Sequence, residues 1–265
     1  MINMIRSINY STRKNLVVVL TVISMICLPV FMVTMVMGAS ITEIDGAEYY
    51  CKMLGESFFV VIFASLILSC IPSSADAGDK TLNYELMAGH SRSRVFLART
   101  FVGVFWGVII LAILYYYPLI LFGCLGGWYK GVSIKDVLMH CLLSLLPLFR
   151  MSAFCIMLSS ILRSAGKGIG FTFMALEAGT IIWEIVREMF HLEDHAMPWI
   201  MGMLNLIELH TLTNARDYVI EGEKVTVYET ALSQQLVIST VIASLLMGCI
   251  YLVIAYIDFK KRDRD

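Results

Sequence analysis

The stretch LVVVLTVISMICLPVFMVTMVMGA, Leu16–Ala39, carries no charged residue. A helix needs about 20 mostly apolar residues to cross roughly 30 Å of hydrocarbon, so this stretch is long enough to span a bilayer. The residues before it include Arg6, Arg13 and Lys14, which is also the charge pattern of a secretory signal peptide. Its apolar run is longer than the apolar core of a signal peptide, about 7–15 residues, and we therefore expect it to remain as a membrane anchor.

Five more apolar windows follow along the chain. They are Leu54–Pro72, Phe101–Gly123, Val137–Leu162, Gly168–Met189 and Leu236–Ile257. Hydrophobic residues make up 58% of the chain, charged residues 15%, and the mean hydropathy is +0.78, a balance far from that of a soluble domain. The net charge of -1 gives no general attraction to nucleic acid. These features predict one domain over residues 1–265, an all-α integral membrane protein with six transmembrane helices.

The basic residues predict which way the chain sits, because Lys and Arg collect on the cytoplasmic flanks of membrane helices. One set of flanks carries Arg6, Arg13, Lys14, Lys80, Arg92, Arg94, Arg99, Arg163, Lys167, Lys260, Lys261, Arg262 and Arg264. The other set carries Lys52, Lys130, Lys135, Arg187, Arg216 and Lys224. The two sets alternate as six spans require. We expect a multi-pass protein of the cell membrane with both termini cytoplasmic.

Three segments outside the spans have patterns of their own. Residues 1–14 predict an amphipathic interfacial helix with basic residues against anionic lipid, or else a frayed polar leader. Residues 190–235 form the predicted outer region, whose first half is apolar enough to be partly re-entrant. Its second half alternates Val225 and Val227 with polar neighbours around EGEK, which favours a small hairpin.

The third segment is KTLNYELMAGHSRSRVFLART, Lys80–Thr100, between the second and third spans. Asp79 is suited to cap a short helix that starts at Lys80, Gly89 fits a C-terminal stop, and Ser91 can cap the helix that follows. An ordinary solvated loop does not need an apolar cluster beside polar residues, as this segment has. We expect residues 80–100 to be cytoplasmic, with a short helix that serves either as a docking surface or as a plain connection. The residues of the apolar cluster and its polar neighbours are Leu82, Tyr84, Glu85, Leu86 and Met87.

Ionisable residues inside spans are costly to bury and usually find partners. Arg150 lies in the fourth predicted span, and Glu177 and Glu184 lie seven residues apart on nearly one face of the fifth. A short turn near Ala165 joins the two spans, which places Arg150 level with a point between the two glutamates. We expect a buried ion pair, which either fixes helix packing or lies along a substrate path.

The seven cysteines lack CxxC spacing and fall mostly within spans, so we expect no disulfide framework. A bridge between Cys51 and Cys124, both near the predicted outer face, stays open. The run SAGKGIG, Ser164–Gly170, fails the phosphate-loop pattern, which requires Gly where Ile161 stands and Ser or Thr where Gly168 stands.

A zinc-peptidase motif is a second candidate for a functional site in the sequence. HLEDH, His191–His195, resembles an inverted zinc-peptidase motif with Asp194 in place of Glu. Further ligands could come from His210, Glu193 and Glu208. Its position next to Pro198 favours an acidic solvated rim instead of a metal site. We therefore expect no catalytic residues, no metal and no cofactor in this chain.

The segment Lys80–Thr100 resembles the cytoplasmic segment after the second span in membrane subunits of the ABC type-2 exporter family, particularly small bacterial ones linked to antimicrobial-peptide and lantibiotic export or immunity. Matching positions are Thr81, Leu82, Gly89, Ser91 and Arg92, with Arg99 in place of a lysine. Lys80 and Asn83 depart from the pattern, which has Gly and Lys there. The C-terminal YIDFKKRDRD is similar to the aromatic and basic ending of the family.

This resemblance implies a permease subunit that does no covalent chemistry itself. It implies a second permease subunit, identical or related, and separate ABC ATPase subunits that bind ATP and Mg. The ATPase-coupling residues it implies, taken with the apolar cluster above, are Thr81, Leu82, Tyr84, Glu85, Leu86, Gly89, Ser91 and Arg92. The substrate would be a peptide, an antimicrobial compound or a lipid-like molecule, exported across the lipid bilayer.

Two other classes of function stay open. One is a membrane-bound metallopeptidase that uses His191, Asp194, His195 and His210. The other is a sensor or immunity protein that binds a peptide at the outer region without transport. A neighbouring reading frame for a P-loop ATPase would favour the exporter, and stoichiometric zinc in purified protein would favour the peptidase.

Overall fold

Helices make up most of the chain that the structure describes. The computed structural model describes residues 1–31, 58–74, 88–128, 133–190, 214–220, 223–229 and 234–261. Its helices are α1 (Ile2–Lys14), α2 (Leu16–Phe31), α4 (Phe58–Ser74), α7 (Arg92–Leu125), α8 (Ile134–Leu143), α9 (Leu145–Leu162), α10 (Ala165–Phe190) and α13 (Gln234–Lys261). The strands β1 (Asn214–Ile220) and β2 (Glu223–Glu229) form one antiparallel hairpin.

Several of these helices are long and apolar enough to cross a membrane. Among the described residues there are three such stretches, Arg92–Ile110, Val137–Leu162 and Val237–Lys261. The bent pair α1 and α2 adds a fourth if it counts as one span. The expectation of a helical membrane protein agrees with this, whereas the count of six transmembrane helices stays a prediction. Parts of the first two predicted spans, residues 32–39 and 54–57, lie outside the described residues.

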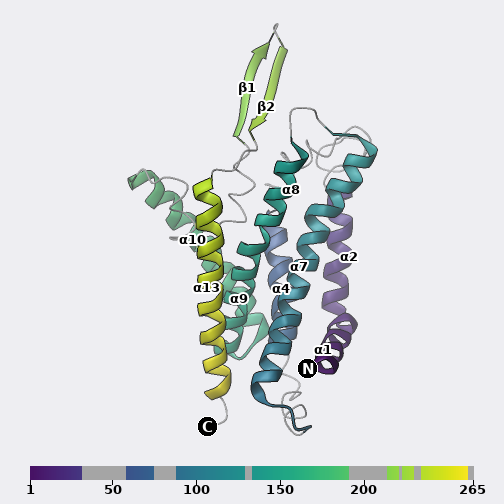
Figure 1. The fold of residues 1–265 in the computed structure, drawn as a ribbon, viewed down its shortest axis with the longest axis vertical. Coiled ribbons are helices and arrows are strands. Elements are labelled where there is room, and N and C mark those ends of the chain that lie inside the picture. The colour runs from purple at the N-terminus through teal and green to yellow at the C-terminus, as the bar shows by residue number, and fades with distance from the viewer. Residues whose placement is uncertain are drawn as a thin grey trace.

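Both termini lie at one end of the helical bundle (Figure 1). We call this the terminal end, and it also holds the start of α7 and the turn between α9 and α10. The hairpin of β1 and β2 projects from the opposite end. The helices thus run between two opposite ends, as expected for a protein that crosses a bilayer.

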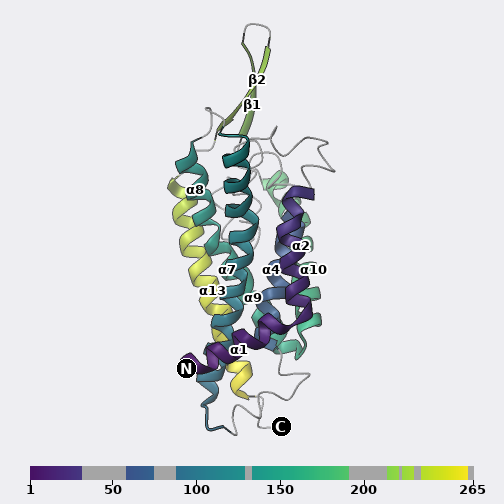
Figure 2. The same ribbon diagram turned by 90° about the vertical axis from the view of Figure 1, so that its right-hand side faces the viewer.

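A sharp corner joins α1 to α2. Asn15 at the corner has extended backbone angles, φ -69° and ψ 121°, and its side-chain oxygen accepts a hydrogen bond from the Val17 N–H at 2.9 Å. This side chain satisfies one of the free N–H groups at the start of α2, as an N-cap does. The two helices are bent by 70°, so α1 crosses the terminal end of the bundle (Figure 2). The prediction of a helix over residues 1–14 is confirmed.

The longest helix is α7, which has 34 residues. At about 1.5 Å per residue it measures about 51 Å, well beyond the roughly 30 Å of a hydrocarbon core. It begins at Arg92, nine residues before the apolar window Phe101–Gly123, and therefore carries Arg92, Arg94 and Arg99 into the bundle as part of one helix.

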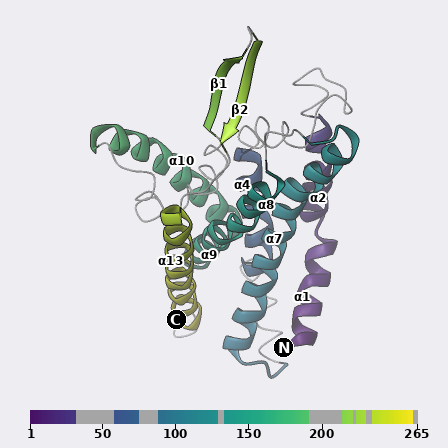
Figure 3. The ribbon, with the colours of Figure 1, turned by 45° about the horizontal axis from the view of Figure 1, so that its top comes forward.

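The central helix is α9, which packs against α4, α7, α10 and α13. A break at Ser144 separates it from α8, so the predicted fourth span, Val137–Leu162, consists of two helices. The fifth predicted span corresponds to α10, whose first half packs on α9 and α4. Its second half leans away from the bundle (Figure 3). The apolar residues Ile181, Ile185 and Met189 are exposed there and suit contact with lipid.

The hairpin corrects the all-α description of the chain. It pairs Tyr218 with Val225 and Arg216 with Val227, which confirms the alternating pattern seen in the sequence. The alternation of Val225 and Val227 with polar residues is a strand period, and it prevails over the helical character of the rest of the chain. The predicted re-entrant half of the outer region, residues 191–213, lies outside the described residues.

Candidate functional site

The predicted coupling segment reaches the described part of the chain only at its second half. Thr81, Leu82, Tyr84, Glu85 and Leu86 fall within residues 75–87, outside the described residues. Described residues resume at Ala88, and the predicted short helix over residues 80–88 therefore stays a prediction. The remaining predicted coupling residues, Gly89, Ser91 and Arg92, stand where α7 begins.

The backbone before α7 has the turn that the sequence predicts. Gly89 adopts φ +83°, in the left-handed region where a side chain is strained. Ser91 occupies the N-cap position with extended angles, and its carbonyl accepts the N–H groups of Arg94 and Val95 at 3.0 and 3.1 Å. The glycine turn and the N-cap together set the path of the backbone from Ala88 into α7.

The terminal end is strongly basic. Its described segments, residues 1–15, 88–100, 160–168 and 256–261, carry Arg6, Arg13, Lys14, Arg92, Arg94, Arg99, Arg163, Lys167, Lys260 and Lys261. The acidic side chain in these segments is that of Asp258. At the opposite end the described residues include Lys135, Arg216 and Lys224 among the cations. The structure therefore gathers at one end those basic residues of the predicted cytoplasmic flanks that it describes.

Specific contacts hold the helices together at the terminal end. The hydroxyl groups of Ser93 on α7 and Tyr256 on α13 lie 2.8 Å apart. Phe96 packs between Tyr256 and Phe259, with ring centroids 5.5 Å away in each case. The Ser160 hydroxyl donates to the Asp258 carboxylate at 2.9 Å and so joins α9 to α13. The start of α7 is thus packed directly against the end of α13.

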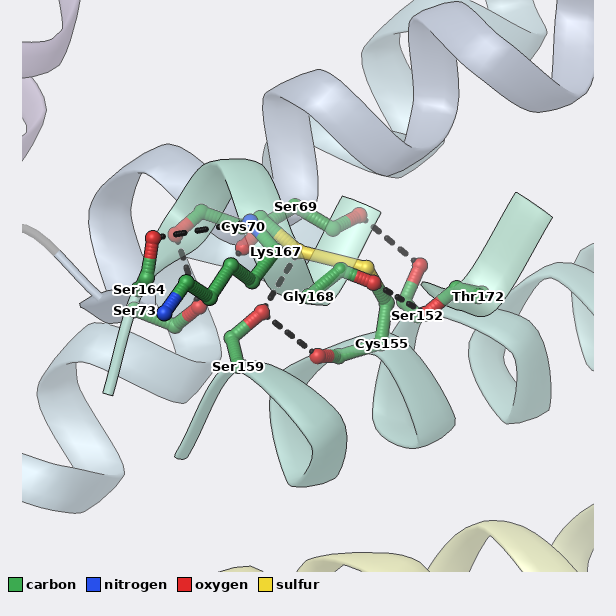
Figure 4. The surroundings of a disulfide bond; sticks show 10 residues. All are labelled: Ser69, Cys70, Ser73, Ser152, Cys155, Ser159, Ser164, Lys167, Gly168 and Thr172. Atoms are coloured by element: carbon green, nitrogen blue, oxygen red, sulfur yellow. Dashed lines mark hydrogen bonds between the residues drawn. A yellow bond between two sulfur atoms is a disulfide. The ribbon is translucent and has the colours of Figure 1, made fainter. Parts of the chain in front are cut away.

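Behind the terminal end, small and polar residues fill the junction of α4, α7, α9 and α10. We call it the small-residue cluster, and it comprises Ser69, Cys70, Ser73, Gly103, Gly107, Ser152, Cys155, Ser159, Gly168 and Thr172. The hydroxyls of Ser69 and Ser152 lie 2.9 Å apart, and Ser159 donates to the Cys155 carbonyl at 2.7 Å (Figure 4). Thr172 donates to the Gly168 carbonyl at 2.7 Å. Hydroxyls that are satisfied in this way contribute to helix packing.

Glycines allow these helices to approach one another closely. A Cβ added at Gly103 would lie 2.6 Å from the Ser69 carbonyl oxygen. One added at Gly107 would lie 3.0 Å from the Ser69 hydroxyl and 3.2 Å from that of Ser152. Small residues spaced four apart are a common packing motif of membrane helices. The sequence GVFWG, Gly103–Gly107, carries this signal, which the sequence analysis missed.

A disulfide within the cluster joins two cysteines for which no bridge was expected. Cys70 of α4 and Cys155 of α9 are bonded, with their Cα atoms 6.5 Å apart. The expectation rested on sequence spacing and on the apolar surroundings of the spans, neither of which reports which helix faces meet. Cys124 is a free thiol, whereas Cys51, its suggested partner, lies outside the described residues.

Arg150 is fully buried on α9, at 0% exposure. The turn predicted near Ala165 is present, because Arg163 closes α9 in the left-handed region at φ 53° and α10 starts at Ala165. Both glutamates proposed as its partners, Glu177 and Glu184, lie on α10, but their side chains fall outside the described part of the structure. The ion pair therefore stays a prediction. The structure does show that Arg150 is buried, which is the condition under which a charged side chain needs a partner.

The alternative metal site falls outside the described residues. His191, Asp194, His195 and His210 all lie between residues 191 and 213. Within the described residues, no group of three or more His, Cys, Asp or Glu side chains is placed to hold a metal ion. The run Ser164–Gly170 forms the turn and the first residues of α10, with Gly168 packed against Ser159.

Comparison of the chain with protein-family models, with curated proteins and with solved structures finds no match.

Proposed function

We propose that this chain is the membrane-spanning permease subunit of an ATP-driven exporter of the ABC type-2 kind. The observation that carries the proposal is the resemblance at Thr81, Leu82, Gly89, Ser91 and Arg92. The structure supports it by the place of Gly89, Ser91 and Arg92, which lie at the basic terminal end where α7 begins. A soluble partner that docks next to Gly89 would contact the start of a long helix.

In this proposal the ATPase is a separate subunit that carries ATP and Mg, and this chain has no covalent chemistry of its own. Residues 80–88 dock on the ATPase, and α7 transmits the movement of that subunit into the bundle. Because α7 packs on α4, α9 and α13, a shift at Ser91 would move several helices together. ATP binding would then favour one of two conformations, inward-open or outward-open, through the contacts that differ between them.

The remaining parts of the proposal concern assembly and placement. The permease has six transmembrane helices, lies in the cell membrane with its terminal end cytoplasmic, and pairs with a second permease subunit. The exported substrate belongs to peptides, antimicrobial compounds or lipid-like molecules. The basic composition of the terminal end supports this orientation, because Lys and Arg favour the cytoplasmic side.

Co-purification of the ATPase with a tagged permease tests the docking role. Interfaces concentrate their energy in a few anchors, and removal of one commonly costs about 2 kcal/mol or more. The double variant Tyr84→Ala/Leu86→Ala should therefore lose the ATPase and uncouple transport, while its yield in the membrane stays the same. Leu97→Ala/Phe101→Ala is the matched control, because both residues are exposed apolar side chains on α7. If the Tyr84/Leu86 variant retains the ATPase in full, residues 80–88 are an ordinary loop.

A further inference from the structure

The helix α1 has two faces with different surroundings. Met4, Ile8 and Thr12 are buried and belong to the face that packs against the bundle. Met4 and Ile8 join a core that also contains Trp106 of α7, and the Trp106 indole N–H donates to the Asn9 side-chain oxygen at 3.1 Å. The apolar face of this amphipathic helix is therefore covered by protein, so lipid is not needed to bury it.

The opposite face of α1 is exposed. It carries Ile2, Arg6, Tyr10 and Arg13, which follow one another at intervals of three or four residues and so share one side of the helix. Ile2 is 68% exposed and Tyr10 66%. The Lys14 ammonium lies 5.7 Å from the centre of the Tyr10 ring, so a third cation stands beside this face. We call these five residues the outer face of α1.

The surroundings of the outer face favour an anionic partner. The helix α1 crosses the terminal end of the bundle (Figure 2), and the described segments of that end carry Asp258 as their acidic side chain. Asp258 accepts a hydrogen bond from Ser160, on the side of the bundle where α9 meets α13. Three cations with an exposed isoleucine and tyrosine match the boundary between phosphate headgroups and acyl chains, where long basic side chains reach up to the phosphates.

We propose that the outer face of α1 is a binding site for the headgroups of anionic phospholipids. Arg6, Arg13 and Lys14 donate to the lipid phosphates, with the guanidinium groups suited to paired hydrogen bonds. Ile2 and Tyr10 rest at the top of the acyl region. Since Met4 and Ile8 already pack on the bundle, binding depends on headgroup charge and not on burial of the apolar face. The Asn9–Trp106 hydrogen bond then links α1, with its bound lipid, to α7.

Native mass spectrometry of the full chain in detergent tests this site. The protein is titrated with phosphatidylglycerol in one series and with phosphatidylcholine in another, and bound lipids are counted. Each basic residue near an anionic surface contributes about 1 kcal/mol, so Arg6→Gln/Arg13→Gln/Lys14→Gln should weaken phosphatidylglycerol binding by about a hundredfold. Phosphatidylcholine binding should not change. Arg6→Lys/Arg13→Lys keeps the charges and should retain most of the binding.

The control variant Arg94→Gln/Lys260→Gln/Lys261→Gln removes the same charge from the same end of the bundle, but from α7 and α13. It should lose much less phosphatidylglycerol binding than the α1 variant. An equal loss would show that general charge, and not α1, attracts the lipid. An equal loss of both lipids in the α1 variant would also overturn the proposal, because it would show that the basic residues do not select for the charge of the headgroup. The outcome does not depend on the proposed exporter function.

Discussion

At the scale of single residues, the close approach of α4 to α7 depends on the absence of a side chain at Gly103. A methyl group there would lie 2.6 Å from the Ser69 carbonyl, a backbone atom that can move only if the helices separate. Membrane helices gain little from the hydrophobic effect between themselves, so loss of this packing is not offset. The sequence contains the motif, but the motif alone does not tell which helix it meets.

Gly103→Ala should therefore lower the stability of the bundle. Forcing a methyl group into a packed interface costs about 1–3 kcal/mol. The matched control is Gly166→Ala in α10, where an added Cβ meets nothing within 4 Å. That variant should keep or slightly raise stability, because alanine favours helix over glycine. Size-exclusion chromatography after heating in detergent measures both, and equal melting of the two variants would contradict the packing argument.

At the scale of elements, α7 is bounded by two glycines in the same unusual conformation. Gly89 before it has φ +83°, and Gly127 after it has φ +85°. An added Cβ meets no atom within 4 Å at either position, so the strain of a substitution comes from the backbone alone. Of the two, only Gly89 lies in the predicted coupling segment. Substitutions at the two glycines can therefore be compared to distinguish an effect on ATPase coupling from an effect on stability.

Gly89→Val and Gly127→Val should each cost about 1–2 kcal/mol, the penalty for a left-handed residue with a side chain. Both should therefore melt at similarly lowered temperatures. Gly89→Val should also reduce co-purification of the ATPase, because it redirects residues 80–88, whereas Gly127→Val should not. Gly89→Asn should retain the partner, since Asn tolerates this region. If the two valine variants retain the ATPase equally, Gly89 has no specific role in coupling.

Local signals in the sequence predicted local structure well. The helix over residues 1–14, the N-cap at Ser91 and the glycine turn at Gly89 each depend on a few neighbouring residues, and all are present. The alternation around Val225 predicted the hairpin for the same reason. Such features need no knowledge of where distant segments lie.

Contacts between distant segments were not predictable in the same way. The apolar face of α1 was expected to suit the membrane interface, but in the structure Met4 and Ile8 face α7. The Cys70–Cys155 bond joins residues 85 positions apart and depends on which faces of α4 and α9 meet. An apolar window in the sequence predicts that a helix is buried. It does not distinguish burial in lipid from burial against other helices.

At the scale of the whole molecule, the shared position of both termini, the start of α7 and the turn after α9 sets a strict condition on topology. These parts lie at one end of the bundle, so they must face the same side of a membrane that the bundle crosses (Figure 1). The basic residues of that end predict that it faces the cytoplasm. The opposite end, with Ser133 before α8 and the hairpin, must then face outward.

Labelling of single cysteines with an impermeant maleimide measures this arrangement in intact cells. In a background with the seven native cysteines replaced, Ser91→Cys and Ser7→Cys should react only after the membrane is permeabilised. Ser133→Cys should react in intact cells. All three side chains are exposed, so a lack of reaction reports the side of the membrane and not burial. Because Ser7 and Ser91 lie at one end and Ser133 at the other, the predicted orientation is compatible with only this pattern of labelling. Reaction of Ser91→Cys in intact cells would reverse the orientation and place the proposed ATPase-docking segment where no cytoplasmic ATPase can reach it.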